Sequence, residues 1–164
     1  MSQKVYYCKN WSIGYKEPID LWGEEKARKK HEAGEPYTVL IDSESTPSCF
    51  INIMRNSGWV SVSFLDEHLR EYLLYNFRVL DVEMLFLSMA VYREFNDDTD
   101  LVINGTTYHF KEDGHTIIIE DDISNNTSER SETYSDVAGN YEEFPVFGKY
   151  DSLSRKERWV ITNL

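Results

Sequence analysis

Residues 49–65 read CFINIMRNSGWVSVSFL, two stretches rich in strand-forming residues on either side of a short polar loop. Every second position in these two stretches is apolar: Cys49, Ile51, Ile53, Val60, Val62 and Phe64. Such alternation places one side of each strand in a core. The loop Asn56-Ser57-Gly58 is of the short, glycine-containing type that joins antiparallel strands. We therefore expect a β-hairpin with one buried face.

Similar patterning continues on both sides of this hairpin. Residues 37–41 have the composition of a strand, and residues 72–79 alternate through Leu73, Tyr75, Phe77 and Val79, although residues 72–77 are also compatible with a helical turn capped by Asp66. Since sequential strands joined by short loops usually pair with each other, the region of about 37–79 is predicted to form an antiparallel meander.

Two segments have the periodicity of helices. Apolar residues recur at three- and four-residue steps after Asp81, at Met84, Leu85, Ser88, Val91, Tyr92 and Phe95, which predicts a packed helix at about 82–95. Near the N-terminus, Asp20 is a candidate cap for an outer helix at about 20–33. Acid-before-base pairs such as Glu24/Arg28 support that helix, and Gly34 supplies its stop.

A second meander is expected at about 101–120. Its candidate turns are Asn104-Gly105 and Asp113-Gly114, two dipeptides that suit two-residue hairpin turns. Pairing across Asp113-Gly114 would set Phe110 opposite Ile117 and Tyr108 opposite Ile119. One apolar face would then contain Leu101, Ile103, Tyr108, Phe110, Ile117 and Ile119.

Together these elements predict an α+β fold in a single domain spanning residues 1–164. Residues 121–143 are rich in Ser, Asn, Thr, Asp, Glu and Gly, so we expect a long acidic loop there. No apolar run approaches the roughly 20 residues needed to cross a bilayer, and the first four residues lead into no signal-peptide core. The sequence therefore favours a cytoplasmic protein.

The negative charge is concentrated in one part of the chain. The whole protein has a net charge of -12, and residues 94–143 alone hold 14 acidic and two basic side chains. The remaining residues are balanced, with 15 of each sign. Nucleic-acid and anionic-membrane binding need a surplus of positive charge, so both are disfavoured. The segment is either a solvated acidic face or a docking surface for a basic partner.

No motif for metal, cofactor or catalysis is complete. Asn96, Asp98 and Asp100 have the opening spacing of a calcium loop, but Leu101 and Thr107 stand where glycine and glutamate are required. With a turn at Asp113-Gly114, His109 and His115 would point to opposite faces. No Gly-x-Ser-x-Gly elbow or phosphate loop occurs. Cys8 and Cys49 have the surroundings of small core residues.

Aromatic residues interspersed among the acids of the expected loop point to an interface, since rigid aromatics inside a charged rim commonly form binding hot spots. For Phe144 and Phe147 an ordinary place in the core is the preferred interpretation, whereas both interpretations stay open for the tyrosines. The candidate partner-binding residues are Asp121, Asp122, Glu129, Glu132, Tyr134, Asp136, Tyr141, Glu142 and Glu143.

Residues 37–95 carry a family resemblance. The hairpin from Pro47–Ile53 to Gly58–Phe64, followed by an apolar helix with Leu85-Phe86-Leu87, resembles the immunity proteins of bacterial polymorphic-toxin and contact-dependent inhibition systems. The resemblance implies a protein without catalytic activity that binds a cognate toxin domain, often a nuclease or deaminase, and blocks its active-site cleft. The acidic surface would then stand in for nucleic-acid phosphates.

Two alternatives remain at this point. One is a nucleic-acid mimic that inhibits a DNA-binding enzyme, which uses the same acidic surface. The other is a small hydrolase whose carboxylates act as acid and base, with residues 121–143 as a lid. The hydrolase requires a carboxyl group with a raised pKa inside a pocket.

Overall fold

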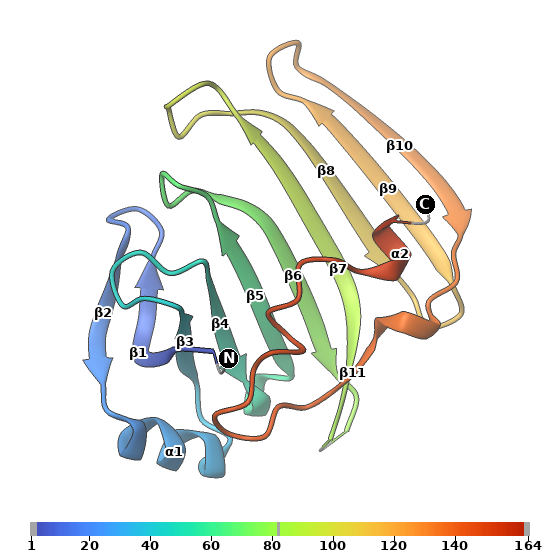
Figure 1. Ribbon diagram of the computed structural model, residues 1–164. Helices are drawn as coiled ribbons and strands as arrows, with labels where there is room; N and C mark the ends of the chain where they lie inside the picture. Colours follow the sequence, from blue (N-terminus) through green and yellow to red (C-terminus); the bar gives the residue numbers. More distant parts are fainter. Residues whose placement is uncertain (1–2, 82, 163–164) are drawn as a thin grey trace.

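The computed structural model describes residues 3–81 and 83–162, most of which belong to one large antiparallel sheet (Figure 1). The strand order is β10-β9-β8-β7-β6-β5-β4-β3-β1-β2, with β11 paired to β7. The strands are β1 (Val5–Ser12), β2 (Glu17–Trp22), β3 (Tyr37–Ile41), β4 (Cys49–Met54), β5 (Trp59–Leu65), β6 (Glu71–Val79), β7 (Met84–Phe95), β8 (Val102–Phe110), β9 (His115–Asp122), β10 (Thr127–Tyr134) and β11 (Tyr141–Glu143). The helices are α1 (Glu24–Ala33), α2 (Trp159–Thr162) and the single 3₁₀ turns η1 (Arg55–Ser57) and η2 (Ala138–Asn140).

From β3 to β10, neighbours in sequence are neighbours in the sheet, so the chain runs as one continuous meander. The hairpin of β1 and β2 completes the sheet beyond β3. Strand β11 pairs with Met84–Phe86 in the first part of β7, whereas β8 pairs with β7 from Met89 onward. Strand β7 thus has partners on both sides over most of its length.

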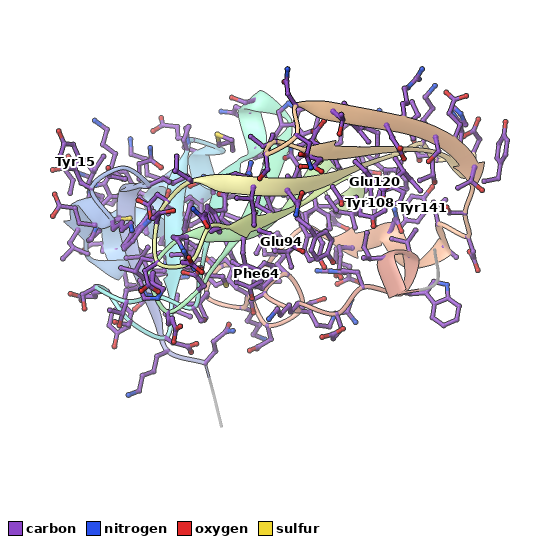
Figure 2. All side chains as sticks on the ribbon, turned by 90° about the horizontal axis from the view of Figure 1, so that it is seen from above. Tyr15, Phe64, Glu94, Tyr108, Glu120 and Tyr141 are labelled. Carbon is purple, nitrogen blue, oxygen red and sulfur yellow. The ribbon has the colours of Figure 1, made fainter. Side chains whose placement is uncertain are left out.

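One face of the sheet carries the main core. Alternate residues of the central strands point to it, and Figure 2 shows that the C-terminal segment (residues 144–162) lies along this side. The segment contributes Phe144, Tyr150, Leu153 and Val160 to the buried cluster. The hydroxyl groups of Tyr37 and Tyr150 lie 3.1 Å apart within it. Burial of these large side chains attaches the segment to the sheet.

A smaller apolar cluster lies on the other side of the sheet near β1. It is formed by Cys8, Trp11, Leu40, Phe50 and Leu65. Cys8 and Cys49 are both buried free thiols, one in each cluster, as expected from their apolar neighbours.

The expected α+β class is wrong, because the fold is dominated by strand, at 51% of the residues against 12% helix. The meander over residues 37–79 is present as β3–β6. The outer helix begins at Glu24 rather than Asp20, since residues 17–22 form β2 and Gly23 occupies the cap position. Gly34 ends α1 in the left-handed conformation with φ 70°.

The helix expected over residues 82–95 is instead strand β7, with residue 82 outside the described residues. Leu85, Phe86 and Leu87 are all buried, because β7 lies inside the sheet and its first half is covered. A strand buried on both sides has a continuous apolar run, which is compatible with helical spacing as well. The longest strand of the sheet therefore had the pattern of a helix.

The second meander, expected at residues 101–120, differs from the expectation in its first turn and in its register. Asn104-Gly105 lies inside β8, and the chain reverses at residues 96–101, where Asn96 N donates to Leu101 O at 2.8 Å. The turn between β8 and β9 is longer than two residues, because Lys111 N donates to His115 O at 3.0 Å.

Consequently the register is shifted by one residue. Phe110 pairs with Thr116 and Tyr108 with Ile118, so Ile117 and Ile119 lie on the opposite face from the two aromatics.

The acidic loop expected over residues 121–143 is mostly regular structure. It contains the end of β9, all of β10, the turn η2 and β11. All eight residues of β10 are exposed, so this strand has no alternation that sequence patterning could detect. Among the described residues, neither helix is both long and apolar enough to span a membrane.

Candidate functional site

The hairpin of β9 and β10 forms one margin of the sheet and is ordered at both ends. Its eight residue pairs run from Thr127↔Asp122 to Tyr134↔His115 without a register shift. At the β9–β10 turn, Asn125 donates from its backbone N to Asp122 Oδ1 at 3.1 Å and from Nδ2 to Oδ2 at 2.8 Å. At the other end, Thr116 Oγ1 donates to Ser135 Oγ at 2.9 Å. The backbone positions of the acidic residues along the hairpin are thus fixed by its register.

Five carboxylates line an open groove at the end of this hairpin near the β9–β10 turn. The groove has a volume of about 340 Å³, and its polar floor includes Asn104, Thr106 and Thr127. We call it the acidic trough and define it by its five acidic residues, Glu94, Glu120, Asp121, Asp122 and Glu129.

Register explains why four of these residues share a face, whereas Asp121 lies between Glu120 and Asp122 on β9 and points to the opposite face at the margin of the groove. Glu129 is paired with Glu120, which is paired with Thr106 on β8. One step along the strands, Asp122 is paired with Asn104, which is paired with Glu94 on β7. Paired residues point to the same face, so carboxylates from three strands share one patch of the face that carries the main core. Figure 2 shows Glu94 on the same side of the sheet as the core residue Phe64.

No cation neutralises the acidic trough within the described part of the chain. None of its five carboxylates takes part in an ion pair there, although the protein has ion pairs elsewhere, such as Arg78 with Glu112 at 3.0 Å. Glu94 accepts a hydrogen bond from Asn104 Nδ2 at 3.2 Å. The hydrogen bonds from the Asn125 side chain and backbone hold the pKa of Asp122 below its usual range. The carboxylates of the acidic trough therefore lie close together without a cation of the described residues between them.

Other residues expected at the partner-binding site lie outside the acidic trough. Glu132 and Tyr134 are three and five positions from Glu129 along β10, so their side chains point to the opposite face of the sheet. Glu132 lies 3.0 Å from Arg130 and 3.7 Å from His115. Tyr134 is 75% exposed at the end of the strand.

Asp136 follows β10 in the turn before η2, where its Oδ1 accepts a hydrogen bond from Ala138 N at 3.0 Å. Tyr141 begins β11, with its ring against Phe86 and its hydroxyl donating to Glu112 Oε1 at 3.1 Å. Glu143 is exposed at the end of the same strand. These three residues are thus separated from the acidic trough by the length of the hairpin.

Glu142 is an internal residue. Its carboxylate accepts hydrogen bonds from Arg158 Nη1, from Arg155 Nη2 at 2.9 Å and from Ser152 Oγ at 2.6 Å. The side chain is 9% exposed. Glu142 therefore fastens the C-terminal segment, and its charge is occupied inside the protein. Phe144 is buried and Phe147 packs beside the core, as preferred from the sequence.

Glu94 and Glu120 were missed as candidate site residues. Both belong to the acidic segment, but Glu94 was assigned to a helix, and the shifted register of β8 and β9 placed the row containing Glu120 on the wrong face. Knowledge of how β7, β8 and β9 pair would have placed Glu94 and Glu120 beside the other carboxylates.

The observed register also changes which face of the sheet the histidines occupy. His109 pairs with Ile117, two residues from His115, so both histidines are on the same face rather than on opposite ones. No group of three or more His, Cys, Asp or Glu side chains with the arrangement of a metal site occurs among the described residues.

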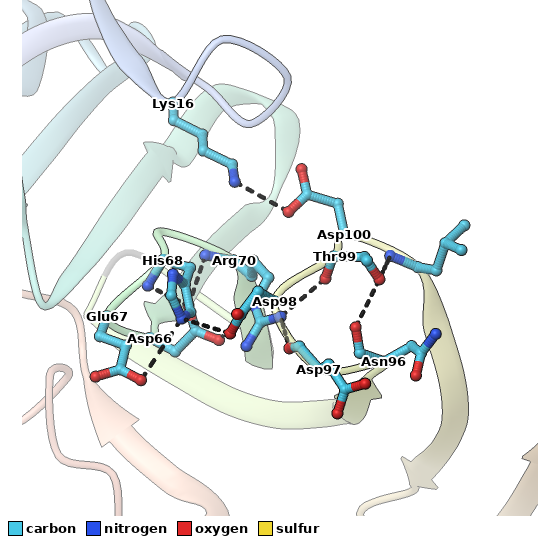
Figure 3. Close-up of polar contacts among 11 residues, drawn as sticks. Lys16, Asp66, Glu67, His68, Arg70, Asn96, Asp97, Asp98, Thr99 and Asp100 are labelled. Atoms are coloured by element: carbon cyan, nitrogen blue, oxygen red, sulfur yellow. Dashed lines mark hydrogen bonds and ion pairs between the residues drawn. The ribbon is translucent and has the colours of Figure 1, made fainter.

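A second polar cluster links three turns at one end of the sheet (Figure 3). Arg70 pairs with Asp66 at 2.8 Å and donates to the backbone oxygens of Asp97 and Thr99 at 2.7 and 2.8 Å. Lys16 of the β1–β2 turn reaches Asp100 at 2.9 Å. Lys16 and Arg70 each pair with a carboxylate here, so this cluster ties the β1–β2, β5–β6 and β7–β8 turns together. It differs from the acidic trough in having internal partners.

Comparisons of the chain with protein-family models, with curated proteins and with solved structures found no match.

Proposed function

We propose that this protein has no catalytic role and binds a basic protein partner through the acidic trough, as an immunity protein does when it covers the active-site cleft of a toxin. One observation carries the proposal: carboxylates of Glu94, Glu120, Asp122 and Glu129 share one face at an open groove, with Asp121 at its margin, and none of the five has an internal ion-pair partner among the described residues. A basic surface would relieve their mutual repulsion on binding. Complementary charge would also accelerate encounter and select among partners.

A nuclease cleft is a suitable basic surface, because it is built to hold phosphates. Carboxylates spaced along neighbouring strands can occupy the same positive sites. The alternative of a carboxylate-dependent hydrolase needs a carboxyl group with a raised pKa. Asp66 and Asp122 show the opposite direction: burial acts to raise the pKa of Asp66, but hydrogen bonds from Arg70 lower it, and hydrogen bonds from Asn125 lower the pKa of Asp122.

The test uses a partner captured by the tagged protein from its native cells at low salt and identified by mass spectrometry. Association rates are then measured across ionic strengths for wild type and two variants. The trough variant combines Glu94→Gln, Glu120→Gln, Asp121→Asn and Glu129→Gln, and it spares Asp122 because that side chain orders the β9–β10 turn. The control removes the same charge at distant exposed positions through Glu17→Gln, Glu32→Gln, Glu44→Gln and Asp151→Asn.

We expect the wild-type and control rates to fall steeply with salt, and the rate of the trough variant to be slow and nearly independent of salt. Equal losses in the two variants would show that only the total charge matters. Unchanged binding of the trough variant would remove the trough from the mechanism.

A further inference from the structure

Strand β10 is the last strand on its side of the sheet, and all eight of its residues are exposed. No described strand pairs with its outer edge. An edge strand presents a row of unpaired N–H and C=O groups, to which another chain can add a strand.

The hydrogen-bond pattern identifies the groups that point outward. Ser135 N donates to Gly114 O at 2.8 Å, so Ser135 faces β9. Along an antiparallel strand, residues facing the partner alternate with residues facing away. The backbone groups that face outward therefore belong to Ser128, Arg130, Glu132 and Tyr134.

The two margins of the sheet differ in how they are protected. In β2, Pro18 has no N–H to offer, and Asp20 takes a positive φ of 51°. Between the pairs Asn10↔Ile19 and Cys8↔Leu21 of β1 and β2, Lys9 and Asp20 do not form a pair. Proline and local irregularity are devices that keep an edge from pairing. Strand β10 contains no proline, and its register is continuous over its whole length.

Charge decides which kind of strand would fit. The β9–β10 hairpin, residues 115–134, has five acidic side chains and one arginine. A residue added beside Glu129 on the outer edge would lie next to the Glu129–Glu120 row and face the acidic trough. A lysine or arginine at that position could place its cation among these carboxylates.

We infer that β10 is a docking edge to which a basic partner adds a strand, with main-chain hydrogen bonds to Ser128, Arg130 and Glu132 and with basic side chains over the acidic trough. This inference rests on the proposed function and adds a geometry to it. The trough supplies attraction, and the edge fixes the direction and register of the bound segment.

A second copy of this chain is a less suitable occupant. If Ser131 faced its own copy, Arg130 would lie opposite Glu132 of that copy. However, each chain brings a net charge of -12, and the acidic troughs of both chains would then lie on the two sides of the joined edge. Charge therefore favours a basic partner over self-association.

The experiment uses a fluorescently labelled peptide of alternating lysine and threonine, equal in length to β10, and the same peptide methylated at every backbone amide. Both carry the same charge, but the methylated peptide can donate no main-chain hydrogen bond. The protein variants are Ser128→Pro, which removes one outward N–H, and the control Ser128→Ala, which keeps it. Neither changes the charge or an amide that faces β9.

At low salt we expect the unmethylated peptide to bind wild type and Ser128→Ala equally. Methylation and Ser128→Pro should each weaken binding about tenfold or more, since each removes main-chain hydrogen bonds. Hydrogen exchange at Glu129 and Ser131, whose amides face β9, checks that Ser128→Pro keeps the hairpin. If these amides lose protection, the two peptides still decide the question on wild type.

Equal binding of the two peptides would overturn strand addition and leave the charge-based proposal standing. Failure of both peptides to bind at low salt would count against the acidic trough as well. A dimer seen by light scattering for wild type and lost in Ser128→Pro would assign the edge to a second copy and overturn the basic partner.

Discussion

Arg158 and Glu142 meet inside the protein, where Nη1 of the guanidinium donates to Oε1 of the carboxylate and the side chains are 2% and 9% exposed. Arg158 also donates to the backbone oxygen of Ser152 at 3.0 Å, and its guanidinium lies 5.2 Å from the ring centre of Phe77. The pair thus connects β11, the C-terminal segment and the face of the sheet.

Breaking this pair should be costly. We expect Glu142→Gln to lower the free energy of unfolding by about 3–5 kcal/mol, because it removes the carboxylate that Arg158 faces in the interior. Arg158→Met should cost less, because Arg155 still pairs with Glu142 at 2.9 Å. The double variant Arg158→Met with Glu142→Leu should recover much of the loss. Urea denaturation of the three variants measures this, and losses below about 1 kcal/mol in both single variants would contradict it.

The turn before β9 should be sensitive to a single methyl group. Gly114 has a φ of 92°, and a Cβ there would lie 2.7 Å from Ser135 O. Gly58 has a similar φ of 84° but open space around it. We expect Gly58→Ala to cost about 1–2 kcal/mol from conformation alone.

Gly114→Ala should cost a further 1–3 kcal/mol or so, because the backbone of Ser135 must move. Denaturation measures the difference, and hydrogen exchange should show loosening confined to β10 and its neighbours. Equal costs at the two glycines would mean that the contact with Ser135 is easily relieved.

His31 should make stability depend on pH. Burial is the largest cause that lowers its pKa, followed by the nearby Arg55, and its Nδ1 lies 2.7 Å from the Tyr37 hydroxyl. His31 therefore binds a proton more readily in the unfolded chain, where its pKa is about 6.5, than in the folded protein. Stability should be highest above that pH and fall as the pH drops through it. Denaturation midpoints between pH 5 and 8 test this, and His31→Gln should have a flatter profile.

The two cysteines should be protected from thiol reagents. Burial raises the pKa of Cys8 to about 11 and that of Cys49 to about 12, and both side chains are almost fully covered. Reaction needs an exposed thiolate, so labelling near pH 8 should proceed only as the protein unfolds. Rapid labelling of the native protein would contradict this.

The carboxylates of the acidic trough should favour partner binding but lower the stability of the folded protein. The trough variant described above should be more stable than wild type at low salt, because unpaired like charges repel each other. The gain should shrink at high salt, where the repulsion is screened. Thermal unfolding at two salt concentrations measures it, with the distant four-charge variant as control. A loss of stability at low salt would indicate a structural role for these carboxylates.

Sequence patterning identified the part of the fold in which every second side chain of a strand belongs to the main core. The strands of residues 37–79 alternate clearly because only one side of each contributes to the main core. The pattern was misleading in β7, whose Leu85-Phe86-Leu87 run is buried on both sides, and in β10, which is exposed on both sides. In both strands the side-chain period of two is absent from the sequence.

The acidic region was visible as composition, but its geometry was not. Asp121, Asp122 and Glu129 were expected at a binding surface and lie in the acidic trough. Glu142 could not be distinguished from them, because its partners Arg155 and Arg158 come from a segment whose position depends on the whole sheet. Assigning it required the register of β11 with β7.

The order of the strands also has a consequence for synthesis on the ribosome. Each strand from β4 to β10 can pair with the one made just before it, so most of the sheet can assemble while the chain is still emerging. The C-terminal segment, which is translated last among these elements, covers the apolar side of that sheet with Phe144, Tyr150, Leu153 and Val160. A ribosome that stalls before residue 144 would therefore hold a nearly complete sheet whose apolar face is exposed to solvent. Chaperones would be needed to keep such nascent chains from aggregating.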